Sequence, residues 1–373
     1  RGPVTALSST RVLVGRELVP ADVVTADGRV TEVAPHGSVP WSTDLGDLVL
    51  APGLVDVQVN GGFGHDITSH PASLWEVAAS LPRQGVTAFC PTVITGPVGT
   101  IDRALGAIGA RPPGFVGAEP LGLHVEGPYI SAERRGAHPL AHVGTFVDPA
   151  PWAPPAVRIV TLAPEVTEMD LVAELARRGV VVALGHTDAR HDVAVAAIGS
   201  GARHVTHVFN AMRPFDHRRP GVVGAALVDD RVTIGLIADG IHLHPTTLAL
   251  VARAVGVDRL VATTDAMAAA GMSPGAYWLG DHEVLTDGVR ARLADGTLAG
   301  SVLTMAESVG RLARFARLDL AASLLAHTAN PARVLGEVGR GEIRVGARAD
   351  LVVLDDDGGV HLTMVGGQVV HEG

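Results

Sequence analysis

Four ionisable residues follow apolar stretches in a pattern that suits a catalytic metal site with a general base beside it. Glu126 ends one such stretch, and His186 and His207 come at the ends of two others. Two histidines and one carboxylate form a common catalytic zinc site, which leaves one coordination position open for water. Asp265 follows a fourth apolar stretch. A carboxylate buried at the end of a strand needs a partner. We therefore expect Asp265 to lie beside the metal and to act there as a general base.

Each of these residues also has a plainer interpretation. A single histidine among the 17 in the chain is more often a core or surface residue whose ring nitrogens are hydrogen-bonded. Glu126 would then bond to nearby backbone, and Asp265 would cap a helix that begins at Ala266. No compact metal motif is present. The functional interpretation therefore requires all four residues to meet at one edge of a sheet.

Eight short apolar runs predict the strands that would bring these residues together. They cover residues 54–60, 86–93, 122–126, 158–163, 180–185, 204–209, 232–238 and 260–264. Helices are predicted over residues 71–84, 168–178, 192–198 and 245–255. This alternation predicts an α/β fold, a TIM-like (β/α)8 barrel with its site at the carboxyl ends of the strands. A doubly wound sheet is the alternative, but no Gly-x-Gly-x-x-Gly turn follows the first strand.

The two ends of the chain lack this alternation with helices. Residues 1–50 and 342–373 contain short strand-like stretches and turns. They are predicted to pair into one small β-sandwich domain, which leaves residues 51–341 as the metal-dependent barrel. A further hairpin-like segment is predicted over residues 277–298.

Composition restricts the class of protein and its partners. The net charge of -10 argues against nucleic-acid binding, and no apolar run reaches the roughly 18 residues of a membrane span. Residues 1–3 lack the apolar core of a secretory signal, and Cys90 is the only cysteine. A reducing, cytoplasmic location is therefore expected. The chain contains no lysine, so a carboxylated lysine cannot bridge two metal ions, and arginine must supply any cationic side chain for a phosphate.

Six segments together resemble the N-acetylglucosamine-6-phosphate deacetylases of the amidohydrolase superfamily. They are APGLVD (51–56), HVEGP (124–128), GHT (185–187), HVFNAM (207–212), ADGIH (238–242) and TDA (264–266). The resemblance covers nearly the whole chain and includes LAGS at residues 298–301. It implies hydrolysis of the acetamide of N-acetylglucosamine 6-phosphate, which yields acetate and glucosamine 6-phosphate.

The resemblance also implies roles for individual residues. Glu126, His186 and His207 would bind the metal, Asp265 would be the acid and base, and His242 would polarise the acetamide carbonyl. The residues implied to meet the phosphorylated sugar are His138, Asn210, Ala211 (through its backbone) and Arg218. Arg218 would come from the neighbouring subunit of a homodimer. It belongs to the loop 213–220, which has three arginines and would otherwise be a solvated basic surface loop.

One departure from many amidohydrolases concerns the number of metals. Where those enzymes carry His-x-His after the first strand, this chain has Gln58 and Asn60. Neutral amides are poor ligands for a zinc-like cation, so one divalent ion per subunit, zinc, is expected.

Rival functions are another amidohydrolase activity, such as that of a cyclic-amide hydrolase or nucleobase deaminase, and a non-catalytic barrel that senses phosphosugars. Asp265 argues against the sensor, because binding alone needs no proton shuttle.

Overall fold

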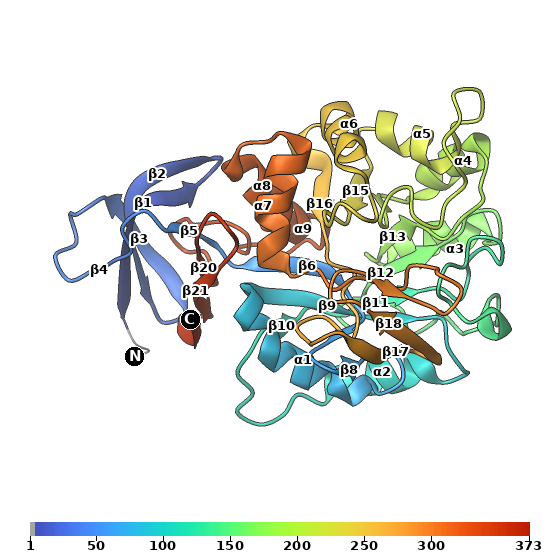
Figure 1. Ribbon diagram of the computed structural model, residues 1–373, viewed down its shortest axis with the longest axis horizontal. Helices are drawn as coiled ribbons and strands as arrows, with labels where there is room; N and C mark the ends of the chain where they lie inside the picture. The colour runs from blue at the N-terminus through green and yellow to red at the C-terminus, as the bar shows by residue number, and fades with distance from the viewer. Residues whose placement is uncertain (1–3) are drawn as a thin grey trace.

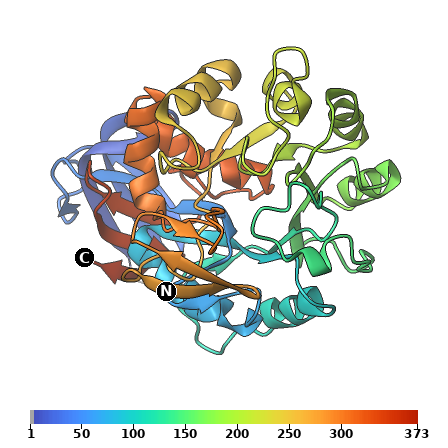
Figure 2. The same ribbon diagram turned by 45° about the vertical axis from the view of Figure 1, so that its right-hand side comes forward.

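The parallel strands form a nearly closed barrel surrounded by helices. The computed structural model describes residues 4–373, and its strands pair in parallel in the order β10-β9-β11-β12-β13-β14-β15-β16, with β6 beside β9. Figure 2 shows the outer helices arranged around these strands. The bounds are β6 Leu54–Val59, β9 Val86–Ile94, β10 Glu119–Pro120, β11 Leu123–Glu126, β12 Val157–Leu162, β13 Val181–Leu184, β14 His204–Val205, β15 Thr233–Leu236 and β16 Leu260–Ala262. The predicted (β/α)8 barrel is confirmed.

A buried carboxylate joins the first and last strands of the barrel. Asp56 on β6 accepts hydrogen bonds from the hydroxyls of Thr263 (2.6 Å) and Thr264 (2.5 Å), which follow β16. Asn60 then donates its backbone N–H to the carbonyl of Ala266 at 2.8 Å. These bonds bring the segment that ends in Asp265 against the end of the first strand.

The four predicted helices are present, and the barrel has five more that were not predicted. The predicted ones are α1 Leu74–Ser80, flanked by the 3-10 turns Pro71–Ser73 and Leu81–Gln84, then α3 Met169–Arg177, α4 His191–Ser200 and α6 Pro245–Val255. The additional ones are α2 Thr100–Gly109, α5 Gly221–Val228, α7 Met305–Ala316, α8 Leu320–His327 and α9 Ala329–Val334. None of the helices in residues 4–373 is long and apolar enough to cross a membrane.

Strands from both chain ends share one mixed sheet beside the barrel (Figure 1). Its order is β22-β21-β20-β5-β1-β2-β3, with β4 paired to β1. The bounds are β1 Thr5–Val14, β2 Glu17–Ala26, β3 Arg29–Pro35, β4 Thr43–Asp44, β5 Val49–Pro52, β20 Leu351–Leu354, β21 Val360–Val365 and β22 Gln368–Glu372. The expected small sandwich is thus one hydrogen-bonded sheet with a small core of its own. The domain boundaries at 50 and 342 stay a prediction, and residues 1–3 lie outside the described part.

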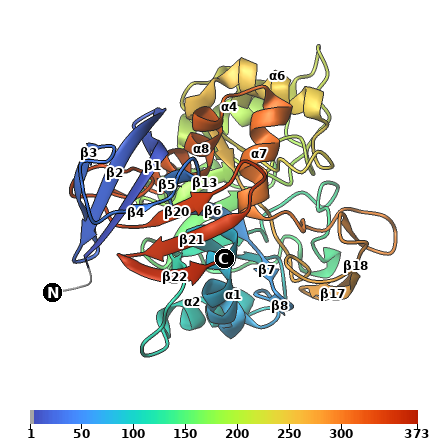
Figure 3. The ribbon, with the colours of Figure 1, turned by 60° about the vertical axis from the view of Figure 1, so that its left-hand side comes forward.

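A three-stranded antiparallel sheet, here called the flap, projects from the barrel on the side away from the terminal sheet (Figure 3). It consists of β17 Gly275–Leu279, β18 His282–Thr286 and β19 Ala291–Arg292, and it confirms the predicted hairpin-like segment with one additional strand. Asp66, at the end of the short strand β8 His65–Asp66, accepts the backbone N–H of Gly280 at 3.1 Å. This bond ties the first turn of the flap to the barrel.

Three buried histidines have structural partners, as expected for core residues. His124 contacts the Val57 carbonyl and the Thr161 hydroxyl, His204 contacts the Thr233 hydroxyl, and His327 contacts the Ser323 carbonyl and the Ser308 hydroxyl. Burial lowers the pKa of His124 and His327 to about 4 and that of His204 to about 3. The folded protein therefore holds these rings neutral at pH values where the unfolded chain protonates them.

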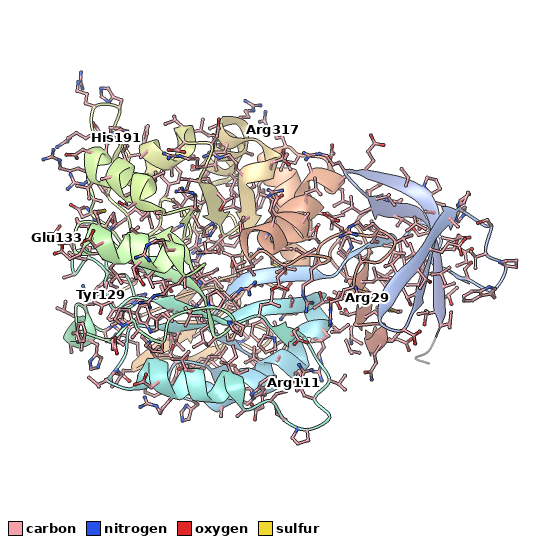
Figure 4. All side chains as sticks on the ribbon, turned by 180° about the vertical axis from the view of Figure 1, so that it is seen from behind. Arg29, Arg111, Tyr129, Glu133, His191 and Arg317 are labelled. Atoms are coloured by element: carbon pink, nitrogen blue, oxygen red, sulfur yellow. The ribbon has the colours of Figure 1, made fainter. Side chains whose placement is uncertain are left out.

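We expect acid to destabilise the metal-free protein between about pH 6.5 and about pH 4. In that range the unfolded state binds more protons, so the free energy of unfolding falls as the pH falls. Each histidine contributes about 1 kcal/mol of this loss between about pH 7 and about pH 5.5. Chemical denaturation at both pH values measures it. His327→Gln should lose its share of the pH dependence, with His191→Gln on the surface (Figure 4) as the matched control. An unchanged dependence in His327→Gln would contradict the assignment.

Candidate metal centre and active site

Three buried side chains converge at the carboxyl ends of the barrel strands. Glu126 is the last residue of β11, and His186 and His207 lie two residues beyond β13 and β14. The Nε2 atoms of both histidines lie 3.1 Å from Oε1 of Glu126 and 3.2 Å from each other. All three side chains are almost completely buried, with exposed fractions of 2 to 6%. The structure therefore brings together the metal-ligand set expected from the sequence.

The donor atoms of this set fit a divalent cation. His186 Nδ1 lies 3.0 Å from the carbonyl oxygen of Arg134, so Nδ1 carries a proton and Nε2 is the ring nitrogen that faces Glu126 and could bind a metal. Lone pairs of nitrogen and carboxylate oxygen repel one another unless a cation lies between them. Ligand atoms of a tetrahedral zinc ion lie about 3.3–3.6 Å apart, close to the separations found here. The donor atoms would need to move apart by only a few tenths of an ångström to hold the ion.

The backbone at these positions adopts conformations that side chains rarely take. His186, His207 and Asp265 have φ values of 47°, 28° and 50°, and Phe209 and Ala211 also have positive φ. Left-handed backbone is costly for residues other than glycine and tends to cluster at functional sites. Each strand therefore turns sharply where its functional side chain must face the axis of the barrel.

The two amides after the first strand contact the site's carboxylates. Gln58 donates from Nε2 to Oε1 of Glu126 at 3.1 Å, and Asn60 donates from Nδ2 to Oδ1 of Asp265 at 2.7 Å. Both amides are buried. Their N–H groups, which cannot bind a metal, point at the carboxylates. This arrangement orients Glu126 and Asp265 and leaves no pair of imidazoles for a second ion.

Asp265 is a buried carboxylate beside the three ligands. It is 8% exposed and lines the same cavity as Glu126 and His207. Burial and the charge of Glu126 raise the pKa of Asp265 to about 6, against the influence of two nearby histidines and the Asn60 hydrogen bond. A carboxylate with such a pKa is suited to proton transfer near neutral pH.

His242 is oriented by a carboxylate that the sequence prediction did not include among the site residues. Asp239 Oδ2 lies 2.6 Å from Nδ1 of His242, and Asp239 Oδ1 accepts the backbone N–H groups of Ile241 and His242 at 2.8 Å. Burial raises the pKa of Asp239, but the bond to His242 and its charge lower it, and the balance lies below the ordinary value. Nδ1 is therefore occupied, and Nε2 is the nitrogen free to meet a substrate. The spacing Asp-Gly-x-His could have revealed this pair.

His138 is a second histidine with a defined tautomer. Its Nδ1 accepts the backbone N–H of Thr95 at 3.3 Å, and its Nε2 lies 3.8 Å from Oε2 of Glu126. Burial and the nearby His186 hold the pKa of His138 well below its ordinary range, so the ring is neutral. Since Nδ1 is an acceptor, Nε2 carries the proton beside the metal ligands.

All but one of the residues assigned to the site from the sequence line a single cavity of about 450 Å³. Arg218 is the exception. It lies on an exposed loop and is not among the described residues that line this cavity. The loop 131–138, the flap and the segment that follows the flap also contribute walls that the sequence prediction did not include, through Glu133, Arg134, Arg135, Gly136, Ala137, Leu279, Asp295, Thr297 and Leu298. Figure 4 shows Glu133 on the side of the barrel away from the terminal sheet, and Arg29 belongs to that sheet.

Comparison with known proteins agrees with this site. Residues 49–370 match the Amidohydrolase family. N-acetylglucosamine-6-phosphate deacetylase of Bos taurus is 38% identical, over 99% of this chain and 96% of its own length. The chain belongs to the N-acetylglucosamine-6-phosphate deacetylase family. The deacetylase of Mycobacterium smegmatis, solved as a mutant in complex with N-acetyl-D-glucosamine-6-phosphate, is 34% identical with a TM-score of 0.91, covering 99% of this chain and 100% of that one.

The deacetylase family includes a relative named for a different sugar. An N-acetylgalactosamine-6-phosphate deacetylase of a Shewanella species is 33% identical to this chain, over 93% of this chain and 91% of its own length. The two sugars differ only in the configuration at C4. Specificity at that position must therefore be measured separately from the deacetylation itself.

Proposed function

We propose that this chain hydrolyses the acetamide of N-acetylglucosamine 6-phosphate to acetate and glucosamine 6-phosphate. The observation that carries the proposal is the convergence of Glu126, His186 and His207 beside Asp265 in one cavity, within a chain of this deacetylase family. A divalent cation in that set supplies a Lewis acid that lowers the pKa of a bound water and polarises the carbonyl. The family and the two-His, one-carboxylate set support zinc as the ion.

Asp265 would perform both proton transfers. Amide hydrolysis adds water to the carbonyl carbon and breaks the C–N bond. A proton must therefore leave the attacking water, and a proton must reach the nitrogen of the departing amine. The Asp265 carboxylate takes the first proton and delivers it to the departing sugar amine. Asn60 holds one oxygen of this carboxylate at 2.7 Å, which keeps the side chain in position for both steps.

Two histidines can stabilise the carbonyl oxygen as negative charge develops on it. His242, held through Nδ1 by Asp239 at 2.6 Å, would direct Nε2 at the carbonyl oxygen and polarise it. Neutral His138 has its Nε2 proton beside the metal ligands and is suited to the same role or to a sugar hydroxyl. Such preorganised donors commonly supply a large share of catalysis in acyl transfer.

The phosphate would be held by backbone and by arginine. Asn210 and the backbone of Ala211 line the cavity, and Arg218 would reach it from the partner of a homodimer. Two observations support the contribution from the partner, namely the exposure of Arg218 and its absence from the lining of its own chain's cavity. The binding partner of the enzyme is thus a phosphorylated N-acetylated amino sugar.

An acetate-release assay tests this function against its rivals. Purified, metal-supplemented protein should release acetate from N-acetylglucosamine 6-phosphate faster than from N-acetylglucosamine. N-acetylgalactosamine 6-phosphate measures selectivity at C4. Cyclic amides and aminated nucleobases test the other amidohydrolase activities, and binding of the phosphosugar without any acetate release would favour a non-catalytic sensor.

We expect about one tightly held divalent ion per chain after dialysis, because the amides of Gln58 and Asn60 donate to carboxylates instead of offering imidazole nitrogens. Elemental analysis of the dialysed protein measures the ratio. The double variant Gln58→His with Asn60→His restores the His-x-His pattern and should retain more metal. Two ions retained per chain by the parent would contradict the single-metal site.

A further inference from the structure

Arg135 is a half-buried arginine that lines the catalytic cavity without a counterion. Its neighbour Arg134 and the nearby Arg213 both form ion pairs with Asp188, at 2.8 and 2.5 Å. Across residues 4–373, no carboxylate lies within ion-pair distance of Arg135. A partly desolvated charge without a partner is unfavourable, so its place in a ligand cavity requires a reason.

The backbone around Arg135 is held rigidly against the site. The Arg134 carbonyl bonds Nδ1 of the ligand His186, and the Arg135 carbonyl accepts the backbone N–H of His138, both at 3.0 Å. A side chain at Gly136 would lie only 3.3 Å from the His186 ring and 3.7 Å from Cβ of Ala211. Gly136, the neighbour of Arg135, thus lies against Ala211, whose backbone is expected to meet the phosphate, and Arg135 lines the same cavity.

Asp295, which follows the last strand of the flap, is an exposed carboxylate that lines the same cavity and forms no ion pair with Arg135. Asp295 accepts the backbone N–H of Thr297 at 2.9 Å. This bond and a second from the Thr297 side chain lower the pKa of Asp295, and the charge of Arg135 lowers it further. Arg135 and Asp295 therefore interact electrostatically without forming an ion pair. An anion that enters between them would meet a guanidinium with its donors available.

We propose that Arg135 binds the substrate phosphate from within the same chain and determines the preference for phosphorylated over unphosphorylated sugar. The inference rests on the proposed function. A sugar phosphate carries nearly two negative charges, and a guanidinium can donate to two of its oxygens at once. Arg218 of the partner would supply one positive charge, and Arg135 supplies the second in a chain that has no lysine.

The test is the comparison of two sugars in Arg135→Gln. With N-acetylglucosamine 6-phosphate, kcat/KM should fall by about 10–100-fold, mainly through KM, because a charge-assisted bond to the phosphate is lost. With N-acetylglucosamine, kcat/KM should not change. Arg135→Lys keeps the charge and should fall by less. Arg292→Gln, on the flap but outside the cavity lining, is the matched control and should behave like the parent.

Several outcomes would overturn the inference. Equal losses with both sugars would place Arg135 at the acetamide end or in folding, and no loss with either would leave it without a role in binding. If Asp295→Asn reproduced the effect of Arg135→Gln, the residue would act by positioning the flap. Calorimetric binding of glucosamine 6-phosphate and glucosamine makes the same comparison without turnover. If the parent released no acetate, the proposed function would fail, while this binding comparison would still decide the role of Arg135.

Discussion

Asp265→Asn should lower turnover at least about 10²-fold and leave the metal bound. Asparagine has the shape of aspartate and its Oδ1 still accepts from Asn60, but it cannot take a proton from water. The three metal ligands are untouched, so metal content should equal that of the parent. Steady-state acetate release and elemental analysis on the same sample measure both quantities.

The substitution separates a chemical role from a structural one. Asn60→Ala removes the hydrogen bond to Asp265 and leaves the carboxylate in place, so it should cost less activity than Asp265→Asn. Activity of Asp265→Asn near the parent level would exclude it as the proton shuttle. Loss of metal together with activity would show that Asp265 belongs to the ligand set.

Mixed dimers of Asp265→Asn and Arg218→Ala should recover activity that neither variant has alone at low substrate concentration. A two-fold interface makes the same contact twice, so one site of the mixed dimer takes both substitutions and the other takes neither. Random co-expression makes half of the dimers mixed, and roughly a quarter of all sites should then work normally. The exposed position of Arg218, outside the cavity lining of its own chain, motivates this expectation.

The experiment distinguishes the shared site from a site within one chain. If Arg218 served its own chain, every site would carry one substitution and no activity would return. Two tags, one on each variant, allow the mixed dimers to be purified and counted. Asp265→Asn co-expressed with itself under both tags is the control and should stay inactive. No recovery in purified mixed dimers would reject the contribution from the partner.

The sequence predicted the barrel and the convergence of Glu126, His186 and His207 because both depend on short segments. Apolar runs give the strands, and the residue at the end of each run gives the site. The strand predicted over residues 204–209 nevertheless ends at Val205, since His207 and Phe209 have positive φ. The functional residues themselves bend the chain out of the strand, which an apolar pattern cannot show.

Other parts of the site depend on contacts between distant segments. The flap meets the barrel through Asp66 and Gly280, which are 214 positions apart, and no local pattern links them. Helix α7 was not predicted, although Thr304 and Glu307 form a capping box that could have indicated its start. Helix α5 is almost entirely small and apolar, so it lacks the polar face by which helices are recognised.

Because Asp56 bonds to two threonines after β16, we expect the active site to be completed late in folding. The carboxylate and its partners Thr263 and Thr264 are separated by about 200 positions, and closing so long a loop is slow. Glu126, His186 and His207 lie at the ends of β11, β13 and β14, which are much closer along the chain, so they can come together earlier. Asp265 reaches them only when the first and last strands meet. A partly folded chain could therefore capture its metal before it is able to cleave an amide.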